Sequence, residues 1–177
     1  MPRPPVDPAL LEIRLWREDD APALGRAIAE SVEHLRPWMA WAAEEPITDA
    51  ERRARIWAWE RSAATGGDET FGVLLGDDVV GGTGLHHRVG RGGLEIGYWV
   101  HVAHTGRGIA TAVAGELVRR AFARPSVTHV EIHHDIANVA SGRGPARRGF
   151  ARGGEHRRPP VAPAETGTER VWRRERP

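Results

Sequence analysis

The sequence predicts a single domain of the mixed α/β class. Two observations carry this prediction: apolar residues recur at helical spacing in some segments and alternate in others, and these segments follow the order β-α-α-β-β-β-α-β-α-β-β. Helices between strands allow parallel pairs beside antiparallel hairpins, so we expect one mixed sheet. The chain has 177 residues, of which 40% are hydrophobic, enough for one core. We assign residues 11–177 to this single domain and the proline-rich residues 1–10 to a flexible arm.

The first part of the domain should contain a strand and two helices. Residues 11–16 alternate between apolar and polar side chains, as in a strand. Apolar residues at steps of three and four predict a helix over residues 19–35, which Pro37 ends because proline has no N–H to donate. The capping-box pattern Thr48-Asp-Ala-Glu51 predicts a second helix to residue 64.

The later segments favour strands around one more long helix. A Gly-Asp-Asp turn joins the alternating residues 70–75 and 79–85, which predicts a hairpin. We expect further strands at residues 94–102, 127–133, 149–151 and 168–173, a weak helix at 138–148 that contains two glycines and a proline, and a loop at 153–167.

The most informative segment is the turn Gly106-Arg107-Gly108, which follows a strand and opens a helix. After Ile109, apolar residues recur at steps of three and four as far as Phe122, so one face of the helix should pack on the core. The first N–H groups of a helix have no acceptor within it, and the helix dipole adds positive potential there. The turn is therefore expected to bind an anion such as a phosphate.

Composition narrows the classes of function. The sequence contains no cysteine, which excludes disulfides, thiolate catalysis and cysteine metal sites, and we expect no metal. No apolar run approaches the roughly 20 residues of a membrane span, so we expect a cytoplasmic protein that has no membrane partner.

Charge is unevenly distributed along the chain. Residues 1–70 hold 9 arginines against 14 acidic residues, and residues 100–177 hold 14 arginines against 7 acidic residues. An anionic ligand on the basic C-terminal part and a cationic ligand on the acidic N-terminal part would explain this distribution of charge. A solvated surface without any ligand would explain it as well. Because the net charge is only +1, we expect no nucleic-acid partner.

Four segments point to one family. Thr105-Gly-Arg-Gly-Ile-Ala110 fits an acyl-CoA signature, Gln/Arg-x-x-Gly-x-Gly/Ala, and Asn138-Val-Ala-Ser141 with Gly149-Phe150 fits a later Asn-x-x-Ser motif. With these, residues 11–175 resemble the GNAT superfamily of acyl-CoA-dependent N-acyltransferases. Glu95-Ile-Gly-Tyr-Trp99 and Leu35-Arg-Pro-Trp-Met-Ala-Trp41 resemble its RimJ/RimL-type branch of protein N-terminal acetyltransferases. Two positions depart from the pattern: Thr105 replaces Gln or Arg, and Gly-Arg-Gly-Pro follows Ser141 where an apolar helix is usual.

The resemblance implies a GNAT fold, whose mixed sheet is splayed at the cofactor site. It also implies that acetyl-CoA is the cosubstrate and that a primary amine attacks the thioester directly. The acceptor would be a protein N-terminal α-amine or a small-molecule amine. Main-chain N–H groups at about Val100 to Val102 would stabilise the oxyanion and bind the pantetheine arm. The cofactor-binding residues implied in this way are Val100, Val102, Thr105, Gly106, Arg107, Gly108, Ile109, Ala110, Thr111, Asn138 and Ser141.

The reaction needs a base and an acid. An α-amine, with a pKa of about 7.7–8.0, loses its proton at neutral pH far more readily than a lysine near 10.4, which favours α-amine acceptors. Glu95, on the strand beside the thioester, is the first candidate for the base and for binding the acceptor, and a purely structural role would explain it equally well. Ser141 is the candidate acid for the leaving thiolate, because the only tyrosine, Tyr98, lies on another element. Histidines that could replace Glu95 as base are His86, His87, His133 and His134.

The seven tryptophans bear on the acceptor and on association. Trp38 and Trp41 follow the first helix, where the resemblance places the acceptor pocket, and core packing is the rival explanation. Trp57 and Trp59 are two residues apart on a helix and cannot share a face, so one should be exposed, which is consistent with a homodimer. Three other functions stay open: an antibiotic-amine acetyltransferase for self-resistance, a non-catalytic acyl-CoA-binding module, and a dinucleotide-binding domain, which would need a complete Gly-x-Gly-x-x-Gly.

Overall fold

The computed structural model describes residues 4–177 and contains the elements in the predicted order. The strands and helices are β1 (Leu11–Leu15), α1 (Ala21–Leu35), α2 (Asp49–Ala64), β2 (Glu69–Leu75), β3 (Asp78–His86), β4 (Gly93–Val100), α3 (Ile109–Phe122), β5 (His129–Asp135), α4 (Val139–Gly142), β6 (Ala151–Arg157) and β7 (Thr168–Glu175). The predicted class, a mixed α/β sheet with helices between its strands, is confirmed.

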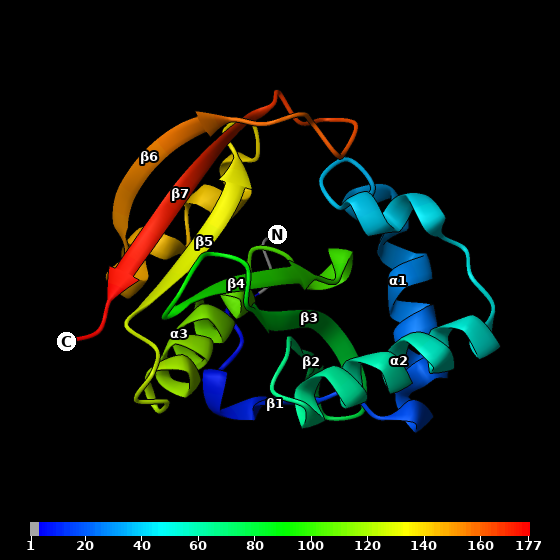
Figure 1. The fold of residues 1–177 in the computed structure, drawn as a ribbon. Helices are drawn as coiled ribbons and strands as arrows, with labels where there is room; N and C mark the ends of the chain where they lie inside the picture. Colours follow the sequence, from blue (N-terminus) through cyan, green and yellow to red (C-terminus); the bar gives the residue numbers. More distant parts are fainter. Residues whose placement is uncertain (1–3) are drawn as a thin grey trace.

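The sheet is mixed and splayed at one place. Its strands lie in the order β1-β2-β3-β4-β5-β7-β6, and β4 with β5 is the one parallel pair among the described strands. These two strands pair only from Gly93–His129 to Glu95–Glu131, although β4 continues to Val100. Beyond Glu95 they separate, as Figure 1 shows. The expected splay is therefore present, and it leaves one backbone edge of β4 without a partner strand.

Helices cover both faces of the sheet (Figure 1). The apolar stripe of α3, with Ile109 and Leu117, is buried in the larger core cluster together with Ile96 of β4. On the opposite face, α1 and α2 pack on the sheet through a smaller cluster that includes Trp16 and Ile28. The two faces therefore have separate cores, and the smaller one lies under α1 and α2.

Local sequence signals explain where α2 begins and where α1 ends. The Thr48 hydroxyl accepts a hydrogen bond from the N–H of Glu51 at 3.2 Å, and the Glu51 carboxylate accepts one from the N–H of Thr48 at 2.7 Å. This is the predicted capping box of α2. α1 ends at Leu35, two residues before Pro37.

Two predicted elements were wrong in extent. The strand expected at residues 149–151 is instead β6, Ala151–Arg157, and it occupies the start of the expected loop. Every residue of β6 is exposed, so this edge strand has no apolar alternation to reveal it, and its pairing with β7 shifts register between Arg152 and Glu155. The helix expected at 138–148 is split into α4 and a 3-10 turn at Pro145–Arg148, because Pro145 cannot donate the N–H that a continuous helix needs.

The N-terminal segment contacts the glycine turn. Residues 1–3 of the expected flexible arm lie outside the described residues. Val6 is 9% exposed within the larger core cluster, and its N–H donates to the carbonyl oxygen of Arg107 at 2.9 Å. Within residues 4–10, Val6 therefore packs on the domain beside the start of α3, and the other six residues are exposed.

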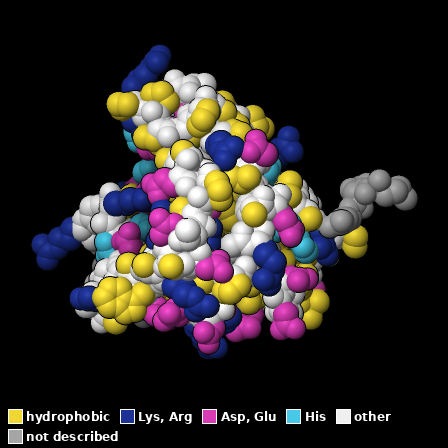
Figure 2. Space-filling model, turned by 90° about the vertical axis from the view of Figure 1, so that its right-hand side faces the viewer, with side chains coloured by type: hydrophobic (Ala, Val, Ile, Leu, Met, Phe, Trp, Pro, Cys, Tyr) yellow, Lys and Arg dark blue, Asp and Glu magenta, His cyan; other side chains and the backbone are white. Residues whose placement is uncertain are grey.

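Figure 2 shows the face of the molecule that α1 and α2 form, on which acidic and basic side chains are interspersed. That face therefore presents no large patch of one charge. Within residues 4–177, no helix combines the length and apolar character that crossing a bilayer requires.

Candidate active site

The turn before α3 has the geometry of an anion site. Gly106 and Gly108 have φ angles of 72° and 83°, in the left-handed region that residues with a Cβ rarely adopt. A Cβ on either glycine would meet no atom within 4 Å, so a ligand can approach this backbone. No group in residues 4–177 accepts a hydrogen bond from the N–H of Ile109, Ala110 or Thr111, and α3 has no side-chain cap. These N–H groups and the helix dipole together fit a phosphate.

The side chains of the turn already have protein partners. Thr105 Oγ1 donates to the carbonyl oxygen of Val102 at 3.1 Å. Arg107 Nε donates to the carbonyl oxygen of Pro4 at 3.0 Å, and Arg107 Nη1 lies 3.1 Å from His104 Nδ1. The main-chain N–H groups of the turn remain available to an anion, as does Arg107 Nη2, and for the main-chain groups the identity of residue 105 matters little.

Some main-chain groups at the end of β4 and just after it already have hydrogen-bond partners within the protein. Val100, the last residue of β4, has a partner on β3 and none on β5. The N–H of Val102 donates to Ser31 Oγ at 3.1 Å, which ties this segment to α1. A pantetheine arm would have to displace Ser31 to reach that N–H, so the unpaired edge of β4 is the more accessible partner.

Asn138 and Ser141 lie at the start of α4 and line one cleft. Asn138 Oδ1 accepts a hydrogen bond from the N–H of Ser141 at 3.2 Å, so Asn138 caps this short helix. The hydroxyl of Ser141 makes no hydrogen bond to any of residues 4–177, which leaves it available to a ligand in the cleft.

Tyr98 lies beside Ser141, which the sequence analysis did not predict. Its hydroxyl donates to the carbonyl oxygen of Ser141 at 3.3 Å. Burial raises the pKa of Tyr98 to about 12, so the phenol is neutral and can donate a proton. Alternation along β4 points Tyr98 and Ile96 toward the face that α3 covers, next to α4. This alternation is the signal that could have placed Tyr98 near Ser141.

A cleft of about 520 Å³ opens between the separated ends of β4 and β5. One wall is the segment after α1, from which Trp38 and Trp41 line the cleft, and the other is the loop 158–167 between β6 and β7. The two walls meet where the N–H of Ala164 donates to the carbonyl oxygen of Pro37 at 3.0 Å. The cleft thus lies where β4 and β5 begin to separate, and the glycine turn comes after the C-terminal end of β4.

Glu95 lies at the base of this cleft, in the last residue pair between β4 and β5. Its carboxylate accepts hydrogen bonds from Arg88 Nε at 2.8 Å and from Arg88 Nη2 at 2.7 Å. This pairing raises the pKa of the Arg88 guanidinium. The Glu95 side chain is 13% exposed and that of Arg88 is 58% exposed, so Arg88 is the partner that can move into solvent.

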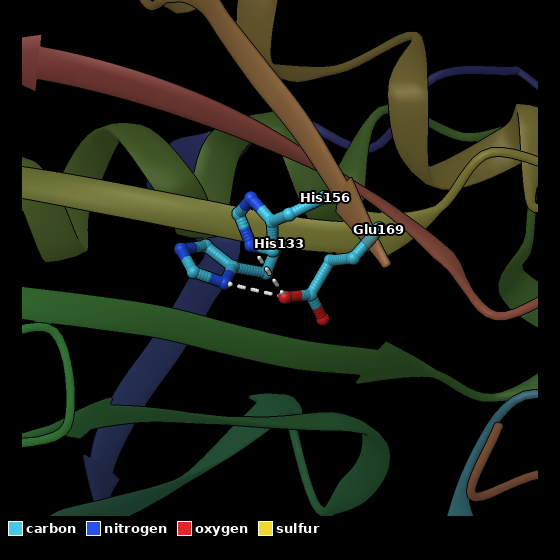
Figure 3. Close-up of side chains that lie close together, drawn as sticks. All are labelled: His133, His156 and Glu169. Atoms are coloured by element: carbon cyan, nitrogen blue, oxygen red, sulfur yellow. Dashed lines mark hydrogen bonds and ion pairs between the residues drawn. The ribbon is translucent and has the colours of Figure 1, made fainter. Parts of the chain in front are cut away.

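Three side chains from neighbouring strands gather beside the cleft (Figure 3). His133 Nε2 lies 2.7 Å from Glu131 Oε2, and His133 Nδ1 lies 3.2 Å from Glu169 Oε2. His156 Nε2 lies 3.3 Å from the same Glu169 oxygen. The ligand atoms of His133, His156 and Glu169 lie within 4.8 Å of one another, so they could hold a divalent cation. Arg158 Nε donates to the other Glu169 oxygen at 2.7 Å. The positive charge of Arg158 would therefore repel a metal ion bound at Glu169.

The other candidate histidines have structural partners or face solvent. His86 Nδ1 lies 2.9 Å from Asp68 Oδ2. His134 is buried, and its Nε2 accepts a hydrogen bond from Trp172 Nε1 at 3.0 Å. Burial lowers the pKa of His134, so it is neutral at pH 7. His87 is exposed after the end of β3.

Fold and site agree with one family. A family model described as "Acetyltransferase (GNAT) domain" matches residues 11–151, so the chain belongs to the GNAT acetyltransferases and is an acetyl-CoA-dependent N-acetyltransferase. The resemblance seen in the motifs is confirmed. The protein "Putative ribosomal N-acetyltransferase YdaF" of Bacillus subtilis (strain 168) is 31% identical over 149 residues, which cover 83% of this chain and 81% of YdaF.

Solved structures that share the fold include two with a bound cofactor. RimL, the ribosomal L7/L12 alpha-N-protein acetyltransferase in complex with coenzyme A, has a TM-score of 0.85 at 18% identity, with 94% of each chain covered. The microcin C7 self-immunity acetyltransferase MccE, in complex with acetyl-CoA and AMP, has a TM-score of 0.85 at 15% identity, over 93% of this chain and 92% of MccE. At these identities the likeness establishes the fold alone.

Proposed function

We propose that this enzyme acetylates the α-amine of a protein N-terminus, with a ribosomal protein as the first candidate. The observation that carries the proposal is the splay of β4 and β5, which joins an anion-binding turn to a walled cleft through an open strand edge. The name of YdaF, a relative over most of the chain, supports a ribosomal acceptor.

The donor would lie along β4. The pyrophosphate of acetyl-CoA would accept hydrogen bonds from the main chain of residues 106–111, and the pantetheine arm would follow the open edge past Val100, with Asn138 beside it. The acetyl group would then reach the cleft. N–H groups of the unpaired edge would stabilise the oxyanion, since donors fixed in place cost no reorganisation when charge develops.

In the reaction, the amine nitrogen attacks the thioester carbonyl carbon, and the bond from that carbon to sulfur breaks. The ammonium form has no lone pair, so Glu95 would accept a proton directly or through water. In this proposal the incoming ammonium replaces the Arg88 guanidinium on the carboxylate, because Arg88 is the exposed partner of the pair. The hydroxyl of Ser141 would pass a proton to the leaving sulfur and take one back from water, with Tyr98 as the alternative donor.

The test is to mix the enzyme with acetyl-CoA and a panel of N-terminal peptides, lysine side-chain analogues and small-molecule amines, and to follow free thiol. We expect turnover with α-amine peptides in preference to lysine analogues at pH 7. Glu95→Gln should lower kcat/KM by about 10²–10⁴ and leave acetyl-CoA binding unchanged. Exclusive turnover of small-molecule amines would refute the assignment of the acceptor, and an undiminished Glu95→Gln enzyme would refute the assignment of the base.

A further inference from the structure

A second cavity, of about 450 Å³, lies between the sheet and the helices α1 and α2. Its size is within the range of about 300–1,000 Å³ that is usual for small-molecule sites. Four indole rings contribute to its walls, and we call it the tryptophan cavity: Trp16, Trp41, Trp59 and Trp99. The centroids of the Trp41 and Trp99 rings are 6.2 Å apart, with the ring planes tilted by 60°. A wall of this kind offers large flat apolar surfaces to a ligand.

The tryptophan cavity exists because the sheet lacks side chains beneath it. Gly82 and Gly84 of β3 and Gly97 of β4 all line it. A Cβ on Gly82 would collide with the indole nitrogen of Trp99. The indole N–H of Trp99 donates to no acceptor within residues 4–177, and it is not fully buried, so it is open to the cavity.

The tryptophan cavity continues into the reaction cleft. Gly97, Trp41 and Arg88 line both. Because side chains alternate along a strand, Glu95, Gly97 and Trp99 share the face of β4 that α1 and α2 cover. An amine held at Glu95 would therefore carry its substituent over Gly97 toward Trp99.

The charged groups in the walls are already paired. Arg52 forms an ion pair with Glu45, at 2.8 Å, and both side chains are 5% exposed. Arg55 pairs with Glu44, and Arg88 pairs with Glu95. An uncharged apolar group therefore suits the tryptophan cavity: Arg52 and Arg55 keep their carboxylate partners, and Arg88, once released from Glu95, can turn to solvent, so a charged group would lose its hydration without a fixed partner in return.

We propose that the tryptophan cavity binds an aromatic or large aliphatic side chain on the residue that carries the accepting α-amine. This inference rests on the proposed function, since it names the acceptor class for that same site. The enzyme would then select acceptors by their first residue.

The test compares peptides that differ only in the first residue: Phe, Leu, Ala or Gly. We expect kcat/KM for the Phe and Leu peptides to exceed that for the Ala and Gly peptides by at least about tenfold, as filling an apolar pocket does. Trp59→Ala should lower kcat/KM for the Phe peptide at least about fivefold and change the Ala peptide less than about twofold. Trp57→Ala is the matched control on the same helix: Trp57 is 53% exposed, lies outside the cavity and should change neither value. If Trp59→Ala does not fold, Trp59→Phe should give a smaller loss in the same direction.

A binding measurement separates this inference from the proposed function. Quenching of tryptophan fluorescence without acetyl-CoA should show phenylalaninamide binding at least about tenfold more tightly than glycinamide, and more weakly to Trp59→Ala. If no amine is acetylated but this preference holds, the proposed function fails and the aromatic site stands. Equal kcat/KM for the four peptides, an equal loss for all of them in Trp59→Ala, or equal binding of the two amides would overturn the inference.

Discussion

Replacing Asp135 by asparagine tests whether one buried carboxylate holds the loop that walls the cleft. Asp135, the last residue of β5, is 3% exposed. It accepts hydrogen bonds from the N–H groups of Ala137 at 2.9 Å, Thr166 at 2.9 Å and Gly167 at 3.0 Å, and from the Thr166 hydroxyl at 3.0 Å. Burial raises the pKa of Asp135, but these hydrogen bonds together lower it more, so its pKa lies below the usual value.

The magnitude follows from the donors. Asparagine can keep its oxygen toward Thr166 and Gly167, which weakens two charge-assisted hydrogen bonds by about 1 kcal/mol each. Its NH₂ group would then face the N–H of Ala137, and an unsatisfied buried donor costs about 1–3 kcal/mol. Because a buried charge is also removed, we expect a net loss of about 2–4 kcal/mol. For a chain of 177 residues this lowers Tm by about 5–15 °C.

The assay is thermal and urea unfolding of Asp135→Asn between pH 3 and pH 7, with exposed Asp77→Asn as control. Because the folded-state pKa of Asp135 is depressed, its contribution is fully present above the unfolded pKa of about 3.9 and is lost as pH falls through the folded value. The difference from wild type should therefore shrink on acidification. The acceptor KM should rise while acetyl-CoA binding is retained. A Tm within about 2 °C of wild type at pH 7, or a difference that grows at acidic pH, would refute this account of the loop.

Three further predictions concern the turn, the acid and the core. Gly108→Ala should cost about 1–2 kcal/mol and weaken CoA binding measured by calorimetry, whereas Gly66→Ala, at a φ of 78°, should cost as much and leave CoA binding intact. Ser141→Ala should lower kcat by about 10² or more and Tyr98→Phe by less than tenfold; the reverse order in steady-state kinetics would assign the proton to Tyr98. Arg52→Ala should cost about 3–5 kcal/mol in urea unfolding, because it leaves a buried carboxylate without its partner, and a loss below about 1 kcal/mol would contradict that reasoning.

The parts of the fold that sequence predicted are those set by local geometry. The helix α3 follows from its apolar spacing and the glycines before it, and α2 follows from the capping box at Thr48. The strand β6 could not be predicted in the same way, because every one of its residues is exposed and its register depends on β7. The break at Pro145 was visible in the sequence, but whether it bends or splits the helix depends on what packs around it.

The candidate site also has one part that the sequence predicts and one part that it does not. The donor would be held by main-chain groups from one turn and one strand, so glycine positions and periodicity suffice to place it. The acceptor side is built from side chains that the fold brings together: Tyr98 meets a carbonyl 43 residues away, and Arg88 reaches Glu95 by reversing direction between β3 and β4. Alternation along β4 gives the face on which Tyr98 lies, but no spacing in the sequence gives its partner or that of Arg88, because these contacts depend on the splay and on two loops that meet over it. Membership of the GNAT family therefore identifies the donor, because main-chain groups of the fold hold it. The acceptor depends on side chains of this chain, so we infer it from the tryptophan cavity.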